Sequence, residues 1–445
     1  MASIAGSVAE LKDDIQRAFA PATVEAAARQ VGHRWRERLL GPATTVAVFA
    51  LQILHGNVAC RAVSHLAGME FSDTAYGNAR KRLPLDLFTR LAWMLGDAAR
   101  GAQDALGRWH GHRVLLIDGS GLSMPDTPEL QRRFGQPGRR KSNPCKPGFP
   151  VMHTLWLFDA ATGLIVDLLH NRHDTHDMAD AAKVHPMLDQ GDVLVGDRGF
   201  CSYAHLALLA WQGTHAVLRV HQRTIVAFAK HRKSQDQLPK RRRRGRPTSR
   251  FVKKLGRHDQ LVRWLKPAQC PNWMDEQVYA TLPDELLLRE LRYTPPKRKG
   301  YRTKQVTLVT TLTDADEYAR DDLAELYHSR WQIEINLRHL KQTMGMDQLH
   351  CHSVEGVLKE LWMYMLVYNL VRLRMLDAAD RQGCDVDRIS FIDALDAMRY
   401  RSPEAADVKL RVNPKRPGRH QPRRIKRPKD RYTYLTRPRS TYRLS

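Results

Sequence analysis

Val114-Leu115-Leu116-Ile117-Asp118-Gly119-Ser120 is the stretch that decides the fold, because an acid follows directly on a run of four apolar residues. A short apolar run bounded by a turn signal predicts a buried strand, so residues 113–118 are expected to form a strand that ends at Asp118. The same arrangement recurs where Val193-Leu194-Val195-Gly196 leads to Asp197, with Arg198-Gly199 after it. Each acid is therefore expected at the end of a strand, where α/β folds commonly place their sites.

The segment between these acids predicts the order strand, strand, strand, helix, strand. Residues 151–158 and 164–170 flank the turn Asp159-Ala-Ala-Thr-Gly163 and predict a hairpin, and residues 178–188 are expected to be helical. In a mixed sheet the first and fourth strands can lie side by side. Asp118 and Asp197 are then expected to meet at one edge of the sheet.

A third acid, Glu334, lies in a stretch that predicts one helix from residue 323 to about 343. At about 100° per residue, one phenol and three cations fall on its face, namely Tyr327, Arg330, Arg338 and Lys341. The opposite face is apolar and is expected to pack inward. The residues alone leave two interpretations open: a solvated face with Glu334 in an ion pair, or a helix that brings a third carboxylate to the other two.

The composition of the 445-residue chain bounds the class of protein. With 42% hydrophobic and 27% charged residues, the chain can build large cores in two to four domains. Lys and Arg number 72 against 47 Asp and Glu, which gives a net charge of +25 and favours nucleic acid as the partner over a membrane surface. No apolar run reaches the ~20 residues of a spanning helix, and the first residues do not read as a secretory signal. Six scattered cysteines indicate a reduced, cytoplasmic protein.

Changes in pattern and charge divide the chain into five expected parts. These are a helical N-terminal DNA-binding domain (1–105), the first part of an α/β core (106–219), a basic β-rich insertion (220–304), the last acid with C-terminal helices (305–405) and a basic tail (406–445). Within the insertion, short strands are expected at 261–265 and 277–282, and residues 305–312 predict another strand. The tail holds too few large aliphatic residues to bury a core.

The N-terminal part predicts helices at residues 44–54 and 58–66, and a third that is capped by Ser72 or Asp73. The last two helices flank Gly68 and are compatible with a helix-turn-helix. A small helical bundle with a solvated basic face fits the pattern about as well.

One further cluster has the composition of a metal site. It comprises His170, His173 and His176 with Asp174 and Asp177. The cluster follows a predicted strand, and hydrogen-bonded surface side chains are the expected state.

The spacing Tyr327-x2-Arg330-x3-Glu334-x6-Lys341 resembles a motif of bacterial insertion-sequence transposases of the DDE type, the hairpin-forming group. The blocks around Asp118-Gly-Ser and Asp197-Arg-Gly-Phe200 resemble the same family in the same order. The resemblance runs from about residue 34 to residue 398.

This resemblance implies a ribonuclease H-like catalytic core that the β-rich insertion interrupts before the last acid. Asp118, Asp197 and Glu334 would be the catalytic residues and would hold two Mg²⁺ or Mn²⁺ ions, which prefer oxygen ligands. The implied activity is metal-dependent cleavage at element ends and strand transfer into target DNA. In relatives this is a cut-and-paste reaction through a hairpin intermediate.

The resemblance also implies contacts with DNA. Tyr327, Arg330 and Lys341 would contact phosphates, Arg338 shares their face, and Arg198 would either do the same or screen Asp197. A flipped base in a hairpin needs an aromatic shelf. Relatives use a tryptophan of the insertion, and the candidates here are Trp264 and Trp273, although a structural role is favoured for each.

The expected partners are double-stranded DNA, as terminal inverted repeats and as target, and a second copy of the chain in a synaptic homodimer, with no membrane. The expected location is the bacterial cytoplasm, in association with the nucleoid. Two other functions are considered: a catalytically silent DNA-binding relic or inhibitor, and a ribonuclease H-like nuclease without strand transfer. The intact set of acids and the basic helix favours the transposase.

Overall fold

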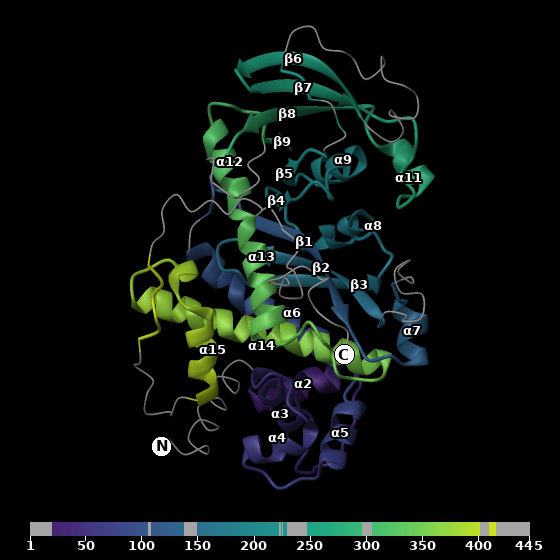
Figure 1. The fold of residues 1–445 in the computed structure, drawn as a ribbon, viewed down its shortest axis with the longest axis vertical. Coiled ribbons are helices and arrows are strands. Elements are labelled where there is room, and N and C mark those ends of the chain that lie inside the picture. Colours follow the sequence, from purple (N-terminus) through teal and green to yellow (C-terminus); the bar gives the residue numbers. More distant parts are fainter. Residues whose placement is uncertain are drawn as a thin grey trace, which may run out of the picture.

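The computed structural model describes residues 20–105, 108–137, 149–221, 224, 226–228, 247–295, 305–400 and 409–414. The strands in these ranges form one mixed sheet of nine, in the order β3-β2-β1-β4-β5-β9-β8-β7-β6, which follows the long axis of the molecule (Figure 1). They are β1 (Val114–Ser123), β2 (Val151–Asp159), β3 (Ile165–Arg172), β4 (Val193–Gly196), β5 (His215–Arg219), β6 (Thr248–Gly256), β7 (Asp259–Leu265), β8 (Glu285–Tyr293) and β9 (Val306–Thr310).

The first half of the sheet confirms the predicted pairing of the first and fourth strands. β4 runs parallel to both β1 and β5, and β2 is antiparallel to β1 and β3. The pairing of β1 with β4 ends at Ile117 and Gly196, so Asp118 and Asp197 follow immediately. One expectation was wrong, because β1 does not end at Asp118. It continues to Ser123, since its other edge stays paired with β2.

The strands of the insertion extend the core sheet. β9 pairs with β5, and β8, β7 and β6 follow in antiparallel order. The predicted strand at 261–265 is confirmed by β7, and the one at 305–312 by β9. The strand predicted at 277–282 is wrong: these residues lie mostly in helix α11 (Glu276–Thr281), which begins where Asp275 accepts hydrogen bonds from two backbone N–H groups.

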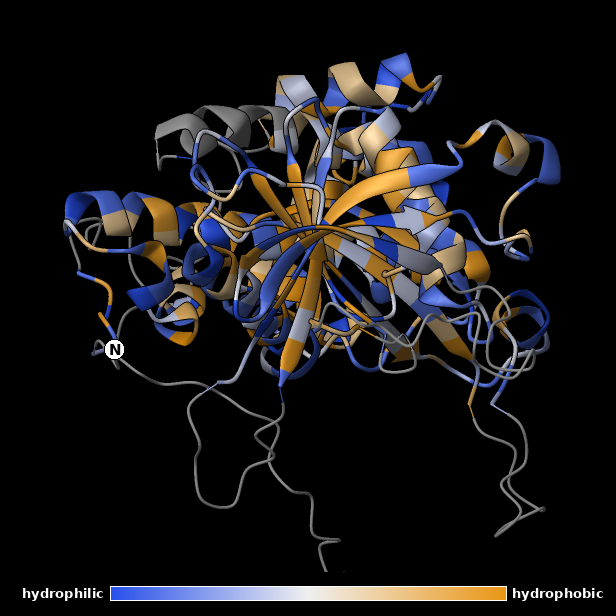
Figure 2. Ribbon diagram, turned by 90° about the horizontal axis from the view of Figure 1, so that it is seen from above, coloured by the Kyte–Doolittle hydropathy of each residue, from blue (hydrophilic) through white to orange (hydrophobic). Residues whose placement is uncertain are grey.

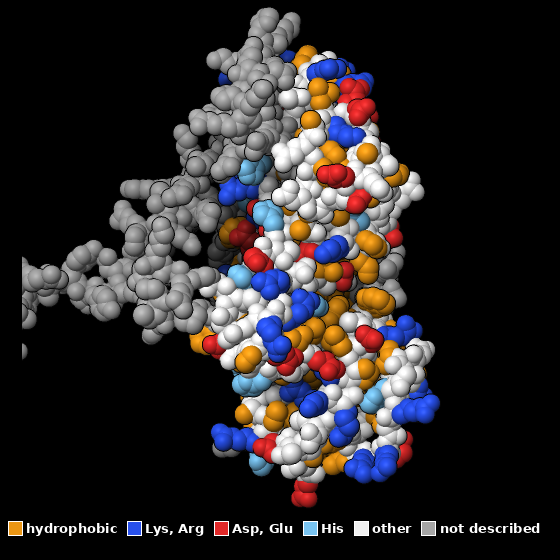
Figure 3. All heavy atoms as spheres, turned by 90° about the vertical axis from the view of Figure 1, so that its right-hand side faces the viewer, with side chains coloured by type: hydrophobic (Ala, Val, Ile, Leu, Met, Phe, Trp, Pro, Cys, Tyr) orange, Lys and Arg blue, Asp and Glu red, His pale blue; other side chains and the backbone are white. Residues whose placement is uncertain are grey.

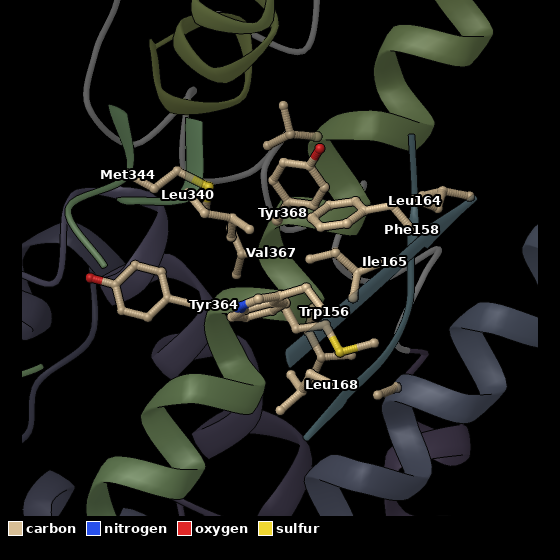
Figure 4. Close-up of a cluster of buried hydrophobic side chains, with 14 of the residues drawn as sticks. Trp156, Phe158, Leu164, Ile165, Leu168, Leu340, Met344, Tyr364, Val367 and Tyr368 are labelled. Atoms are coloured by element: carbon tan, nitrogen blue, oxygen red, sulfur yellow. The ribbon is translucent and has the colours of Figure 1, made fainter. Parts of the chain in front are cut away.

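Helices cover both faces of the sheet, and the alternation of side chains along β1 produces two cores. Leu116 faces one core, which includes α14 (Val354–Arg381), whereas Leu115 and Ile117 face the other, which includes α9 (Tyr203–Trp211). Apolar residues are concentrated in the central strands (Figure 2). On the α14 side, Trp156 and Phe158 of β2 pack against Tyr364 and Tyr368 (Figure 4).

The remaining elements near the sheet are short. On the α14 side they are α7 (Pro128–Phe134), α12 (Arg320–Ser329), α13 (Trp331–Arg338), a π-helical turn (His339–Thr343), a 3₁₀ turn (Val386–Arg388) and α15 (Phe391–Tyr400). On the α9 side they are α8 (Asp177–Ala181) and a 3₁₀ helix (Ala182–Met187), which together take the place of the helix predicted at 178–188.

The N-terminal helices pack against α14, and all but the last of them lie at the lower end of the molecule (Figure 1). They are α2 (Pro21–Gln30), α3 (Pro42–Leu54), α4 (Cys60–Ala67), α5 (Asp73–Arg82) and α6 (Leu85–Ala105). The predicted cap is present, since Ser72 accepts from the Ala75 N–H, and Gly68 adopts a left-handed φ of 59° between α4 and α5. Buried Glu360 of α14 accepts a hydrogen bond from Asn57. These helices therefore share a core with the sheet, and the expected boundary near residue 105 does not separate two cores.

No helix in the described ranges is long and apolar enough to cross a bilayer. The longest, α14, spans 28 residues and buries Lys359, Glu360 and Arg372. The basic run at residues 240–244 and the tail, apart from 409–414, lie outside the described residues.

Candidate active site

The end of the β1–β4 pairing positions two of the three predicted acids. Asp118 Oδ1 accepts a hydrogen bond from the Gly119 N–H at 2.9 Å, and Asp197 Oδ1 accepts one from the Gly199 N–H at 2.6 Å. Asp118 lies on the same side of β1 as Leu116, which shares its core with Ile333 of α13. The Asp118 carboxylate therefore faces the helix that carries the third acid.

Arg330 connects that third acid to the sheet. Its Nη2 donates to Glu334 Oε1 at 2.7 Å, and its Nη1 lies 3.5 Å from Asp118 Oδ2. Burial raises the pKa of Asp118 to about 7, the nearby Arg330 opposes this shift, and the carboxylates of Asp197 and Glu334 add to it. The structure therefore brings Asp118, Asp197 and Glu334 into one electrostatic unit.

The chemistry of this unit suits a hard divalent cation. All three side chains offer carboxylate oxygens, the ligands that Mg²⁺ and Mn²⁺ prefer, and like charges held close together are relieved by a bound cation. In the described part of the chain, no three His, Cys, Asp or Glu side chains already surround a common point as a metal cluster does. Instead, the Arg330 guanidinium lies between Asp118 and Glu334.

The predicted single helix from 323 to 343 is wrong in detail. It divides at Arg330, where i→i−3 hydrogen bonds from Arg330 N to Tyr327 O and from Ile333 N to Arg330 O tighten the backbone. The solvated-face interpretation also fails for Tyr327, which is 7% exposed. Burial raises the Tyr327 pKa, and the Arg330 guanidinium lies 5.8 Å from its ring centre.

The π-helical turn carries Lys341 back to β1. Its Nζ donates to Ser120 Oγ at 3.1 Å and to the Gly121 carbonyl at 2.8 Å. Burial lowers the Lys341 pKa. A cation is thus fixed two to three residues beyond Asp118 on the same strand, and Ser120 is a site residue that sequence reasoning did not assign.

The other predicted DNA contacts differ in accessibility. Arg338 is exposed and Arg198 is half-buried. The structure contradicts a stacking role for Trp264, which is 2% exposed and donates its indole N–H to Glu290 Oε1 at 2.9 Å. Trp273, which precedes α11, is only partly buried. It therefore remains the candidate for stacking on a base.

Among the described residues the histidine cluster does not gather around a common point, and one of its acids lies beside Gly119 of β1. His173 contacts the Phe134 carbonyl and His176 caps α8, as expected of hydrogen-bonded residues. Asp177, in contrast, has its Oδ1 within 2.7 Å of His153 Nε2 and lies directly beside Gly119. Sequence reasoning missed this placement, because nothing local to Asp177 indicates which strand its helix will pack against.

Comparisons with known proteins bear on the same region. Residues 109–370 match the family described as Transposase DDE domain. The chain is similar to the transposase InsG of insertion sequence element IS4 from Escherichia coli K12, at 27% identity over 291 residues, or 64% of this chain. The match spans 58% of InsG, less than two thirds of its length. The putative transposase InsL of element IS186A from the same organism is 24% identical over 379 residues, 80% of this chain and 90% of InsL.

Among solved structures, the chain is similar to a piggyBac transposase in a synaptic complex with hairpin DNA. The likeness covers 87% of this chain and 79% of the other, at 11% identity and a TM-score of 0.45.

The family match extends over more than half of the chain and contains all three predicted acids. The chain therefore belongs to the family of proteins with a transposase DDE domain.

Proposed function

We propose that this protein is a DNA transposase that cleaves DNA at the ends of an insertion sequence and transfers those ends into target DNA. The observation that carries the proposal is that Arg330 joins Asp118 to Glu334, while Asp197 lies near enough to raise the pKa of Asp118, in a member of this family. The strand order β3-β2-β1-β4-β5, with β2 antiparallel to its neighbours, supports a ribonuclease H-like core.

In this proposal the three acids hold Mg²⁺ or Mn²⁺, as two ions per site. Such ions activate the attacking oxygen and stabilise the leaving oxygen of a phosphodiester. The chain itself supplies the carboxylates at fixed positions, and Arg330 offsets their charge until a cation is bound. With a cation in place, the Arg330 guanidinium is available to a DNA phosphate.

Basic and aromatic side chains around the acids would hold the DNA strands. Lys341, fixed against Ser120, is positioned to pair with a phosphate beside the scissile bond. Arg338 and Arg198 extend this basic surface, and the Tyr327 ring lies 5.8 Å from the Arg330 guanidinium. Trp273 would stack on a base displaced in a hairpin intermediate. Pairing two element ends requires two active sites, so a homodimer is the proposed assembly.

A second basic surface supports DNA binding by the N-terminal helices. A pocket of about 480 Å³ between residues 33–45 and the end of α5 is lined by Arg34, Arg36, Arg38 and Arg82. None of these four guanidinium groups makes a hydrogen bond or ion pair with another described residue. Trp35 forms part of the wall and stacks on His33 at 5.8 Å. Unpaired guanidinium groups beside an aromatic ring suit a phosphate backbone, and Lys and Arg are frequent over the lower part of the face in Figure 3.

The test is a cleavage assay on the DNA that flanks the gene, with products resolved on denaturing gels as nicks, hairpins and joined strands. The unaltered chain is expected to cut this DNA with Mg²⁺ and to be inactive with EDTA. The variants D118N, D197N and E334Q should bind the DNA and leave it intact. Cutting by these variants would exclude the proposed site, and binding without cutting by the unaltered chain would favour the silent DNA-binding alternative.

A further inference from the structure

Asp177 is a fourth acid that lies near the edge of the sheet where Asp118 and Asp197 are found. It begins α8, on the face of the sheet opposite to α13, and His153 of β2 holds its Oδ1 at 2.7 Å. His153 is mostly buried, and its Nδ1 has no partner in the described structure. The second oxygen, Oδ2, makes no hydrogen bond to any described residue. One carboxylate oxygen is thus fixed and the other is available.

Two glycines next to the predicted acids make room for this carboxylate. A Cβ atom on Gly119 would lie 2.1 Å from Asp177 Oδ1, a separation that no real structure tolerates. A Cβ atom on Gly199 would lie 3.6 Å from Asp177 Oδ2 and 2.9 Å from Asp197 Oδ1. Neither glycine has a positive φ, so the backbone does not require glycine there. The missing side chains instead allow Asp177 to approach the edge that carries Asp118 and Asp197.

The distances place Asp177 close enough to bind the same two metal ions as Asp197. Asp177 Oδ2 and Asp197 Oδ1 lie 3.6 Å and 2.9 Å from one point, so they are separated by no more than the sum of these values, about 6.5 Å. Two ions roughly 3.5–4 Å apart, each about 2.1 Å from its oxygen ligands, bridge carboxylates on this scale. Glu334 lies on one face of the sheet, with α13, and Asp177 lies on the other, with α8, beside Gly119 and Gly199.

We propose that Asp177, oriented by His153, is a fourth carboxylate ligand of the divalent-cation site formed by Asp118, Asp197 and Glu334. This inference rests on the proposed function, because it concerns the same site. A histidine that holds one carboxylate oxygen fixes the direction of the other, as residues behind metal ligands commonly do. The site is then closed from both faces of the sheet.

The experiment measures Mn²⁺ binding to the full chain without DNA, by electron paramagnetic resonance titration. D177N keeps the shape of the side chain and a polar partner for His153 but removes the charge. Its Mn²⁺ affinity should fall by about 10-fold or more, on the scale seen when residues around metal sites are replaced. The matched control is D174N, three residues away, where the exposed carboxylate pairs with Arg172; its affinity should stay at the unaltered value.

A second variant tests the role of His153. H153L should weaken Mn²⁺ binding by less than D177N, because the ligand remains but its direction is lost. Thermal unfolding without metal checks that each variant is folded. An unchanged affinity and stoichiometry in D177N, with the affinity lost in D197N, would overturn the fourth ligand and leave the proposed function standing. Absence of saturable Mn²⁺ binding by the unaltered chain would overturn both.

Discussion

Arg330 donates a 2.7 Å hydrogen bond to Glu334 one helical turn further along the chain, and the same guanidinium reaches Asp118 of β1. This contact fastens the interrupted α12–α13 segment to the sheet. It also compensates two carboxylates that would otherwise repel each other. The Arg330 guanidinium thus supplies positive charge where a metal ion would supply it, and removing this side chain should make the fold depend more on a bound metal ion.

Arg330→Ala is therefore expected to lower the free energy of unfolding by about 1–3 kcal/mol, the range for a lost charged hydrogen bond. Added Mg²⁺ should raise the melting temperature of this variant more than that of the unaltered chain, because the ion replaces the missing charge. Arg330→Lys should restore little, since an ammonium cannot span both carboxylates. Equal Mg²⁺ shifts in all three proteins would contradict this role.

Lys341→Ala should weaken the engagement of a cleaved DNA end without unfolding the protein. The Lys341 ammonium is fixed by Ser120 and the Gly121 carbonyl, so it presents its charge at a constant place beside Asp118. Band-shift titrations with pre-cleaved and uncleaved end DNA measure the effect. The loss should be larger for the pre-cleaved end, and it should shrink as salt is raised. Identical losses for both DNAs would indicate a general charge effect only.

Replacing the two tryptophans of the insertion should have different effects, because one has a structural role and the other is proposed to stack on a base. Trp264→Ala removes a buried ring and its bond to Glu290, and it should destabilise the protein by roughly 3–5 kcal/mol. Trp273→Ala should cost much less stability and should reduce hairpin products in the cleavage assay. Urea unfolding and product analysis measure the two effects. Normal hairpin yield in the Trp273 variant would remove it from the DNA-contact set.

Acid should destabilise the fold through a buried histidine pair. His185 and His205 stack at 5.0 Å and share a 2.9 Å contact between their Nε2 atoms, and burial lowers their pKa values to about 3 and about 4. Between the ordinary pKa of 6.5 and these values, the unfolded chain binds more protons than the folded one. Stability is therefore complete above pH 6.5 and falls as the pH drops toward 4, by up to roughly 1.4 kcal/mol per pH unit for each histidine.

His185→Gln checks the origin of this loss. The glutamine amide can still donate to His205, but it does not titrate, so the slope of unfolding free energy against pH should decrease in this window. Urea unfolding at pH 7, 6 and 5 supplies the measurement. A slope unchanged from that of the unaltered chain would assign the acid sensitivity to other groups.

The turn between β2 and β3 should tolerate no side chain. Gly163 has a φ of 69°, and a Cβ there would lie 2.1 Å from Arg372 Nη2, which is buried beneath the turn. Gly163→Ala should destabilise by clearly more than the roughly 1–2 kcal/mol of left-handed backbone strain. Gly383 is the matched control, with a φ of 57° and no atom within 4 Å of an added Cβ. Equal costs at both positions would contradict the packing argument.

The sequence predicted those parts of the fold in which local pattern and burial agree. The apolar runs before Asp118 and Asp197, the hairpin around Gly163 and the Ser72 cap all depend on neighbouring residues, and the structure contains each of them. The spacing of Tyr327, Arg330, Glu334 and Lys341 left the place of the third acid open, and its resemblance to a family motif predicted a position beside the other two.

The parts that were missed depend on contacts between distant residues. The strand β8 was not predicted because it contains the charged residues Arg289 and Glu290. Both are buried in the structure, where Arg289 pairs with Asp259 and Glu290 accepts hydrogen bonds from Trp264 and Gln260. The division at Arg330 and the π turn at Lys341 follow from tertiary anchoring to β1. Asp177 gave no local signal, since its position depends on the empty space above Gly119.

Anomalous diffraction from crystals of the full chain soaked in Mn²⁺ would locate bound ions relative to the three acids. We expect Mn²⁺ peaks bounded by the carboxylates of Asp118, Asp197 and Glu334, with Arg330 turned away from Asp118. Peaks elsewhere, or a chain saturated with Mn²⁺ in solution that shows none at these acids, would contradict this expectation.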